Sequence, residues 1–347
     1  MKDMVYKTGM YGGSFDPLHV GHIHDMVKAA AMCEELYIMI SWCKGRESTT
    51  PELRYRWIRS CVSHLPNVKI ILIEDEAVSK EVYNTDYYWE KGAEDIRAAI
   101  GKPIDAVFCG SDYEGTNRFE SLYAAESDVI YFDRAEVPIS STEIRKWAME
   151  HWDYIPDVCR PYYTKRVLVL GGESTGKSTL VQNLALAYNT NYVSEVGRDI
   201  CDYAGGEGFM NADDLCEILV RQSCHVMDAL KYSNRILFVD TDALTTLFYA
   251  DFLLSAQEEI DTCRKLAEAI HGISQWDLVL FLEPTVEFVQ DGTRNEEIAA
   301  DREKYSRQIK ALLDQNGVSY QCLDGNYYER FVQAKEWIGE MGVTTVW

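Results

Sequence analysis

The chain has 347 residues, of which 47% are hydrophobic and 26% charged, and its formal net charge is −22. This length predicts two domains, and the ordinary composition argues against disorder. The acidity argues against a general nucleic-acid binder, because phosphate backbones require clustered Lys and Arg, but it permits local nucleotide sites.

Ten cysteines are scattered along the chain without a CxxC pair, which favours reduced thiols over a disulfide framework or a zinc site. The N-terminal MKDMVYKTGM has no apolar signal core, and no window approaches the roughly 18 apolar residues of a membrane span. We therefore expect a cytoplasmic protein.

Short apolar segments alternate with amphipathic ones in the first half of the chain, which predicts a parallel sheet covered by helices. The predicted strands lie in VYKTGMY (5–11), YIMIS (37–41), VKIILIE (68–74), IDAVFCG (104–110) and DVIYFD (128–133). The alternation restarts at residue 165, after the connector HWDYIPDVCRPYYTK (151–165). We expect an α/β protein with two domains, residues 1–155 and 156–347.

The segment GSFDPLHVGH (13–22) follows the first predicted strand and opens a helix. His19 and His22 lie three positions apart at the junction of loop and helix, where both imidazoles can face one anion. Zinc would need a third and a fourth ligand, which are not recognisable nearby. His24 is expected to be a surface or packing residue.

Basic residues follow the second predicted strand of the first domain. Lys44 and Arg46 could reach a substrate phosphate there. Arg54, Arg56 and Arg59 are expected to form an exposed charged face of the next helix.

The segment VLVLGGESTGKST (167–179) matches GxxxxGK followed by Ser, between a predicted strand and a predicted helix. Its backbone amides would surround the β-phosphate of ATP, Lys177 would bridge the β and γ oxygens, and Ser178 would bind Mg²⁺. The other predicted nucleotide-binding residues of this loop are Gly171, Gly172, Glu173, Ser174, Thr175, Gly176 and Thr179.

Acidic residues near the end of RILFVDTD (235–242) are candidates for the kinase chemistry that such a loop predicts. Asp240 suits the magnesium position, and Asp242, or Glu195 and Asp199, could orient or deprotonate an attacking hydroxyl. For each of these acids the alternative is a helix N-cap or a solvated loop charge.

The polar segment QDGTRNEEIAADREKYSRQ (290–308) is expected to close over the nucleotide. Arg294 is the better candidate to neutralise charge on the transferring phosphoryl group, and Arg302 is a second nucleotide-binding candidate. Arg307 is expected to lie on an exposed, salt-bridged helix.

Two segments of the first domain resemble signatures of the nucleotidyltransferase superfamily. GSFDPLHVGH resembles its HxGH motif, in which two histidines stabilise a triphosphate during adenylyl transfer, which gives His19 and His22 that role here. ISSTEIRK (139–146) resembles its second motif. The resemblance implies that Ser140, Ser141, Thr142 and Arg145 grip the outgoing pyrophosphate.

From about residue 8 to 340, the chain resembles the NadR-type bifunctional proteins. The junction STEIRKWAMEHWDYIPDVCRPYYTKRVLVLGGESTGKSTL (141–180) carries much of this resemblance, and SEVGRD, VDTDALTT and VQDGTR add to it. It implies a Rossmann-like nucleotidyltransferase domain followed by a P-loop kinase domain. The kinase would form NMN from ribosylnicotinamide and ATP with Mg²⁺, and the first domain would form NAD and pyrophosphate from NMN and ATP.

The resemblance also implies binding residues. Trp89 is the expected ring-stacking residue, with core packing as the alternative, and Phe288 stands where the family's tryptophan is expected. The expected ATP- and NAD-binding residues of the first domain are Gly12, Gly13, Ser14, Phe15, Lys44, Arg46, Trp89, Gly110, Ser111, Asp112, Ser140, Ser141 and Thr142. The expected ribosylnicotinamide-binding residues are Glu195, Arg198, Asp199, Phe288 and Asp291.

Other interpretations remain open at this point. One is a nucleotide- or NAD-sensing regulator with one weak or inactive site, and another is the same architecture acting on nicotinate or pantetheine nucleotides or on other nucleosides. Some members of the family carry a DNA-binding helix-turn-helix before the adenylyltransferase. Because this chain begins almost at the first catalytic strand, we expect no repressor function, small-molecule partners and no nucleic acid, with homo-oligomerisation open.

Overall fold

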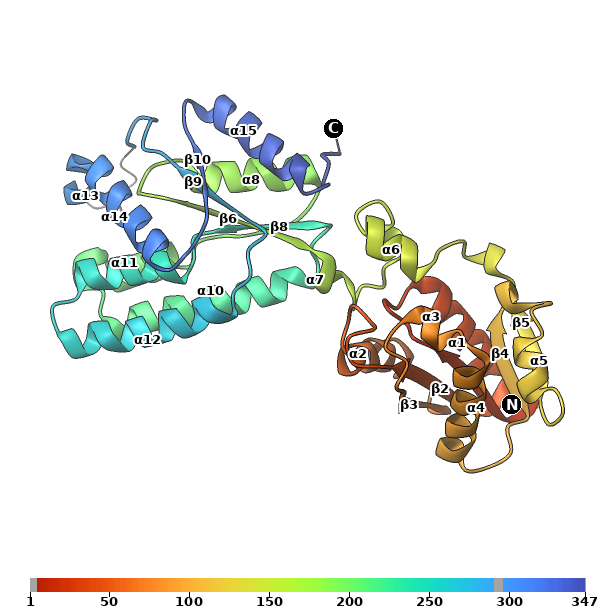
Figure 1. Cartoon of the computed structure of the whole chain (residues 1–347). Coiled ribbons are helices and arrows are strands. Elements are labelled where there is room, and N and C mark those ends of the chain that lie inside the picture. The colour runs from red at the N-terminus through yellow and green to blue at the C-terminus, as the bar shows by residue number, and fades with distance from the viewer. Residues whose placement is uncertain (1–4, 290–295, 347) are drawn as a thin grey trace. The chain divides into compact units, whose positions relative to one another are not determined.

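The computed structural model describes residues 5–289 and 296–346. The chain separates into two compact units, Met1–Cys159 and Arg160–Trp347, each built on its own five-stranded parallel sheet (Figure 1). The expected α/β class with two domains is confirmed. Within the described ranges, no helix is both long enough and apolar enough to cross a membrane.

The sheet of the first unit has the strand order β3–β2–β1–β4–β5, and all its neighbouring strands are parallel. Its strands are β1 (Tyr6–Gly13), β2 (Cys33–Trp42), β3 (Val68–Glu74), β4 (Ala106–Gly110) and β5 (Asp128–Phe132). The strand order reverses between β1 and β4, because the chain first builds outward through β2 and β3 and then returns to the other side of β1. Ligands of open α/β sheets bind at such a switch point, beyond the carboxyl ends of the strands.

Helices cover both faces of this sheet. On one face Tyr11 of β1 donates a hydrogen bond to Asp25 of α1, and on the other Ala93 of α4 packs against Met10 and Met39. The helices are α1 (Val20–Met32), α2 (Pro51–Val62), α3 (Lys80–Tyr83), α4 (Asp86–Ile100), α5 (Arg118–Tyr123) and α6 (Ser141–Trp147), with short 3₁₀ turns η1 (Ser111–Tyr113), η2 (Arg134–Glu136) and η3 (Trp152–Tyr154).

The second unit repeats the architecture with the strand order β10–β9–β6–β8–β7, again all parallel. Its strands are β6 (Lys165–Gly171), β7 (Tyr192–Val193), β8 (Ile236–Asp240), β9 (Leu278–Leu282) and β10 (Gln321–Leu323). β8 is buried along its whole length, as a parallel strand covered on both faces should be. The carboxyl end of the central strand β6 leads directly into the phosphate loop.

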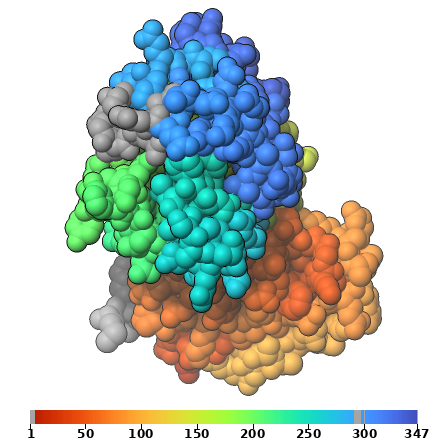
Figure 2. Space-filling view, turned by 90° about the vertical axis from the view of Figure 1, so that its left-hand side faces the viewer, coloured from red at the N-terminus to blue at the C-terminus, as the bar shows by residue number. Residues whose placement is uncertain are grey.

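Helices cover the second sheet from both sides, with α8 and α15 on one face and α10, α11 and α12 on the other (Figure 1). The helices are α7 (Arg160–Tyr163), α8 (Lys177–Tyr188), α9 (Gly197–Ala204), α10 (Ala212–Leu230), α11 (Ala243–Leu253), α12 (Gln257–Ile273), α13 (Glu296–Ala300), α14 (Arg302–Gln315) and α15 (Tyr327–Glu340), with the 3₁₀ turn η4 (Glu207–Phe209). α11 packs against α14, so the teal and blue segments adjoin on the surface of this unit (Figure 2).

Candidate active sites

Two histidines close the first turn of α1 in the first unit. His19 is the N-cap residue: its Nδ1 accepts from the backbone N–H of His22 at 3.3 Å, and Nδ1 of His22 accepts from the N–H of His19 at 3.4 Å. The two rings stack with centroids 3.5 Å apart. Because Nδ1 is an acceptor in both rings, Nε2 carries the proton of each neutral imidazole and is free to donate.

Both imidazoles are neutral at physiological pH. Burial, with Arg134 nearby, lowers the pKa of His19 to about 3, and burial and the neighbouring His19 lower the pKa of His22 well below its usual value. The pair therefore offers hydrogen-bond donors and not fixed positive charge. His24 points elsewhere and pairs with Glu136 on the surface at 2.6 Å.

The loop before the histidines is anchored by Asp16, a residue that sequence reasoning missed. Its carboxylate accepts from the backbone N–H and hydroxyl groups of both Ser48 and Thr49, at 2.7 to 3.0 Å. Phe15 has a left-handed backbone (φ 50°), and its buried ring packs edge-on against His22. These contacts define the conformation of the turn that precedes His19.

The tertiary structure brings α6 against this same loop. The Ser141 hydroxyl donates to the carbonyl of Pro17 at 2.8 Å, and Arg145 donates to the carbonyl of Asp16 and to Thr142 Oγ1. The two predicted signatures thus meet although Arg145 and Asp16 are 129 positions apart. Ser140 caps α6 in a capping box with Glu143, so its hydroxyl is already used by the helix.

Gly110, at the end of β4, faces a pair that completes this side of the site. A Cβ at this position would lie 2.3 Å from Asp112 Oδ1 and 2.5 Å from Arg134 Nε, so any other residue would require this pair to shift. Arg134 binds Asp112 at 3.0 Å, and its backbone N–H donates to the Ser111 hydroxyl. Arg134 was not predicted, because it lies outside both signatures.

The basic residues after β2 differ from one another in their surroundings. Lys44 is exposed and is not among the residues that line the cavity described below. Arg46 is almost fully covered and forks onto Asp75 at 2.6 and 2.8 Å, with Glu47 beside it. In this state it is an internal ion pair, although it lines the cavity wall.

The expectation that Arg54 lies on an exposed face of α2 is wrong. Its side chain is buried, with 0% of the residue exposed, and donates to the carbonyls of Ser14 and Ser41. Arg56 and Arg59 are exposed, as expected. Arg54 therefore holds the backbone just after β1 through the Ser14 carbonyl. The helical spacing alone does not indicate this role.

A cavity of about 820 Å³ opens over the carboxyl ends of β1 and β4. It is large enough for a dinucleotide. Of the predicted residues, those on its wall are Gly12, Gly13, Ser14, Phe15, His19, His22, Arg46, Trp89, Gly110, Asp112, Ser140 and Ser141. Trp89 both borders the cavity, as a ring-stacking residue would, and packs against Tyr113 and Phe119, as a core residue would.

In the second unit the phosphate loop wraps the start of α8. Gly176 is its N-cap, with φ 87°, and Lys177 Nζ folds back onto the carbonyls of Gly171 and Gly172 at 3.1 Å each. The Thr175 hydroxyl closes the loop onto Gly172, whereas Thr179 is exposed on α8.

Ser178 and Asp240 meet at the ends of α8 and β8. The Ser178 hydroxyl donates to Asp240 Oδ2 at 2.6 Å, and the Thr241 hydroxyl donates to Oδ1 at 3.0 Å. Asp242 instead caps α11 by accepting from the backbone N–H of Thr245, and burial raises its pKa. Asp242 is therefore a helix N-cap residue, which is the alternative to a catalytic role.

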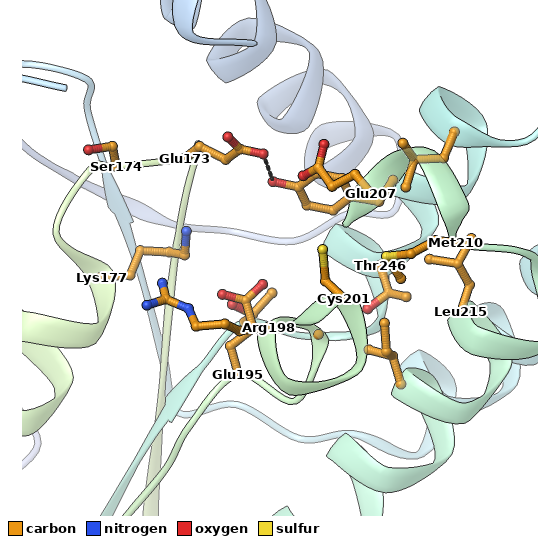
Figure 3. A pocket seen from close by; sticks show the side chains of 15 residues that line it. Glu173, Ser174, Lys177, Glu195, Arg198, Cys201, Glu207, Met210, Leu215 and Thr246 are labelled. Carbon is orange, nitrogen blue, oxygen red and sulfur yellow. Dashed lines mark hydrogen bonds between the residues drawn. The ribbon is translucent and has the colours of Figure 1, made fainter. Parts of the chain in front are cut away.

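A smaller pocket of about 110 Å³ lies beside the phosphate loop (Figure 3). Its wall includes Glu173, Ser174, Lys177, Glu195 and Arg198 among the predicted residues, with Cys201, Glu207 and Tyr249 in addition. The Tyr249 hydroxyl donates to Glu173 at 3.2 Å. Asp199 is exposed on α9, and neither it nor Phe288 lines this pocket.

The segment after β9 packs on the phosphate loop. Arg302 donates to the carbonyls of Val286 and Ser174, and its guanidinium lies 5.8 Å from the Phe288 ring centroid. Buried Arg330 of α15, which sequence reasoning missed, donates to the Thr175 carbonyl. Asp291 and Arg294 lie outside the described residues.

Comparisons with known proteins agree with this arrangement. Residues 10–147 match the Cytidylyltransferase-like family and residues 166–330 match the AAA domain family. Phosphopantetheine adenylyltransferase from Streptococcus pneumoniae is 36% identical over 44% of this chain and 91% of the relative. The Trifunctional NAD biosynthesis/regulator proteins NadR of Escherichia coli and Salmonella typhimurium are each 27% identical over 96% of this chain and 83% of their own length.

The chain is a NadR-type protein. Its fold matches that of a solved relative over most of the chain: a crystal structure of a NadR protein in complex with NR matches with a TM-score of 0.82 at 24% identity, covering 98% of this chain and 97% of that one. A second NadR structure, in complex with NAD and AMP-PNP, matches with a TM-score of 0.79 at 23% identity.

Proposed function

We propose that this chain converts ribosylnicotinamide to NAD in two steps that each consume ATP. The second unit phosphorylates ribosylnicotinamide to NMN, and the first unit adenylylates NMN to NAD and pyrophosphate. The observation that carries the proposal is that one NadR-type chain contains both a histidine loop tied to α6 around a large cavity and a phosphate loop tied to an acidic strand end. The scattered free cysteines fit a reducing compartment, and we place the activity in the cytoplasm.

In the kinase step the 5′-hydroxyl oxygen of ribosylnicotinamide attacks the γ-phosphorus, the bond to the β–γ bridging oxygen breaks, and ADP leaves. Lys177 donates hydrogen bonds to the carbonyls of Gly171 and Gly172, and it would exchange these for the β and γ oxygens of ATP. Glu195 lines the pocket beside Lys177 and is our candidate to accept the proton of the hydroxyl.

The oxygen atoms of Ser178 and Asp240, 2.6 Å apart, fit Mg²⁺, which prefers a few oxygen ligands from the protein together with substrate phosphates. When bound, the ion would neutralise phosphate charge. The hydrogen bond between them places the two oxygen atoms together, where the start of α8 meets the end of β8.

In the adenylyl step an oxygen of the NMN phosphate attacks the α-phosphorus of ATP, and pyrophosphate leaves. The Nε2–H groups of His19 and His22 would donate to the triphosphate. Arg145 and Ser141, already placed against the histidine loop, would hold the outgoing pyrophosphate. Both steps depend on positioning and charge stabilisation, and no cysteine nucleophile is needed.

The test is to incubate the protein with MgATP and ribosylnicotinamide and to follow NMN and NAD. We expect His19→Ala to stop NAD formation while NMN accumulates, and Lys177→Ala to stop NMN formation while supplied NMN is still converted to NAD. The kinase assignment fails if the unmodified protein makes no NMN.

The same assay separates the other interpretations. Supplying nicotinate mononucleotide or phosphopantetheine in place of NMN tests whether the first unit acts on another acceptor. This test is needed because the first unit is similar to phosphopantetheine adenylyltransferases. A sensing regulator with one inactive site would bind ATP or NAD but accumulate NMN without turnover to NAD, or form no NMN at all.

A further inference from the structure

Gln222 is a buried residue in the middle of α10, and its side-chain amide bonds to backbone groups at Val196 and at Asp240 and Thr241. Its Oε1 accepts from the N–H of Val196 at 3.0 Å. Its Nε2 donates to the carbonyl of Asp240 at 2.9 Å and to that of Thr241 at 3.4 Å. One side chain therefore joins two loops from different parts of the chain.

Both loops carry kinase candidates. Val196 follows Glu195, which lines the pocket together with Lys177, and Figure 3 shows these two side chains bordering the same space. Asp240 accepts the hydrogen bond of Ser178. Gln222 thus connects the acceptor side of the pocket with the magnesium side, and it does not line the pocket itself.

The backbone that Gln222 holds is strained. Thr241 has φ 73°, a left-handed conformation that a β-branched residue rarely adopts. Its N–H donates to the Val169 carbonyl at 3.1 Å, and its hydroxyl donates to Asp240 Oδ1. Such conformations persist only where the surroundings determine them, and they concentrate at functional sites.

We propose that Gln222 is a positioning residue for phosphoryl transfer, which sets the Glu195 loop and the Asp240 carboxylate at a fixed separation through its two-sided amide. This inference rests on the kinase function proposed above. It predicts that loss of the amide misplaces acceptor and metal relative to each other, which is costly because displacements of about 1 Å can reduce rates on the order of a hundredfold.

The decisive variant is Gln222→Met, which keeps the length of the side chain and removes all three of these hydrogen bonds. We expect kcat for NMN formation to fall about tenfold or more and the Mg²⁺ concentration for half-maximal rate to rise. NAD formation from supplied NMN, catalysed by the first unit of the same chain, should stay within about twofold.

Ser233→Ala is the matched control for lost stability. Ser233 is also buried, and its hydroxyl donates to Ala229 O at 2.8 Å and Asn191 Oδ1 at 2.7 Å, but it lies beyond the C-terminal end of α10. We expect this variant to lower Tm while kcat and the Mg²⁺ dependence of NMN formation remain those of the unmodified protein.

The proposal is overturned if Gln222→Met lowers Tm as Ser233→Ala does but leaves kcat and the Mg²⁺ dependence unchanged. It is also overturned if both variants lose kcat equally. If the unmodified protein forms no NMN, the proposed function fails instead, and the same comparison is then made on slow ATP hydrolysis by the phosphate loop in a His19→Ala background.

Discussion

At the scale of single residues, the hydrogen bonds of the two Nδ1 atoms determine how His19 and His22 can interact with a ligand. Each Nδ1 accepts a backbone N–H of the other residue, so the start of α1 sets both ring orientation and tautomer. Sequence spacing predicts that His19 and His22 share a face of the helix start. Their neutrality follows from burial, from the effect of His19 on the neighbouring His22 and from Arg134, which is contributed by a turn far along the chain.

The lowered pKa of His19 predicts that acid destabilises the first unit. The unfolded chain takes up a proton near pH 6.5, whereas folded His19 does so only at about 3, so stability is complete above pH 6.5 and falls as pH drops toward 3. Between pH 7 and pH 5 this residue alone should cost on the order of 2 kcal/mol. Urea unfolding at the two pH values measures it.

The control for this prediction is His19→Asn, which retains an N-cap acceptor but cannot titrate. Its free energy of unfolding should depend less on pH than that of the unmodified protein. Equal pH dependence of the two proteins would show that His19 is not held neutral by the fold.

At the scale of elements, α6 matters through its attachment to the histidine loop. Its own sequence supplies a capping box, and the helix is short, with seven residues. Arg145 and Ser141 then bind carbonyls of the loop before α1, so that helix and loop are held as one surface. The two sequence signatures predict the histidine loop and α6 separately. The contact between them arises because the chain returns to that loop after β5.

Arg145→Ala should therefore disable one reaction and spare the other. We expect NAD formation from NMN to fall about a hundredfold or more, since a lost charge-stabilising donor typically has an effect of that order. Lys146→Ala, at the exposed next position, is the control and should leave the rate unchanged. An equal loss of NMN formation in Arg145→Ala would contradict the assignment of this residue to the adenylyl step.

At the scale of the whole molecule, each unit contains its own cavity, lined entirely by residues of that unit. The two reactions therefore require no shared side chain among the described residues. The intermediate NMN is the only chemical link that the proposed reactions need.

A mixture of two inactive variants tests this separation. Neither His19→Ala nor Lys177→Ala alone should convert ribosylnicotinamide to NAD, but equal amounts of both should, because NMN released by the first is used by the second. NAD measured by chromatography reports the result. If the mixture forms no NAD because His19→Ala releases no NMN, although Lys177→Ala still uses supplied NMN, released NMN is not what links the two steps.

The sequence by itself determined the two α/β units and both phosphate-facing loops. These features are local: a buried strand, glycines that permit a tight turn and a helix start follow one another within some fifteen residues, so their chemistry is readable from spacing. The spacing predicts Phe15 in the loop after the first strand and Lys177 and Ser178 at the start of a helix, and the structure has them there.

Only the tertiary structure decided which side chains support those loops. Asp16, Arg54, Arg134 and Gln222 act through partners that lie far from them in the chain, and no periodicity distinguishes them from ordinary surface or core residues. Arg54 and Arg56 differ by two positions on one helix, yet one is buried and the other is exposed. The packing of distant elements, and not residue type, decides which charged groups become part of a site.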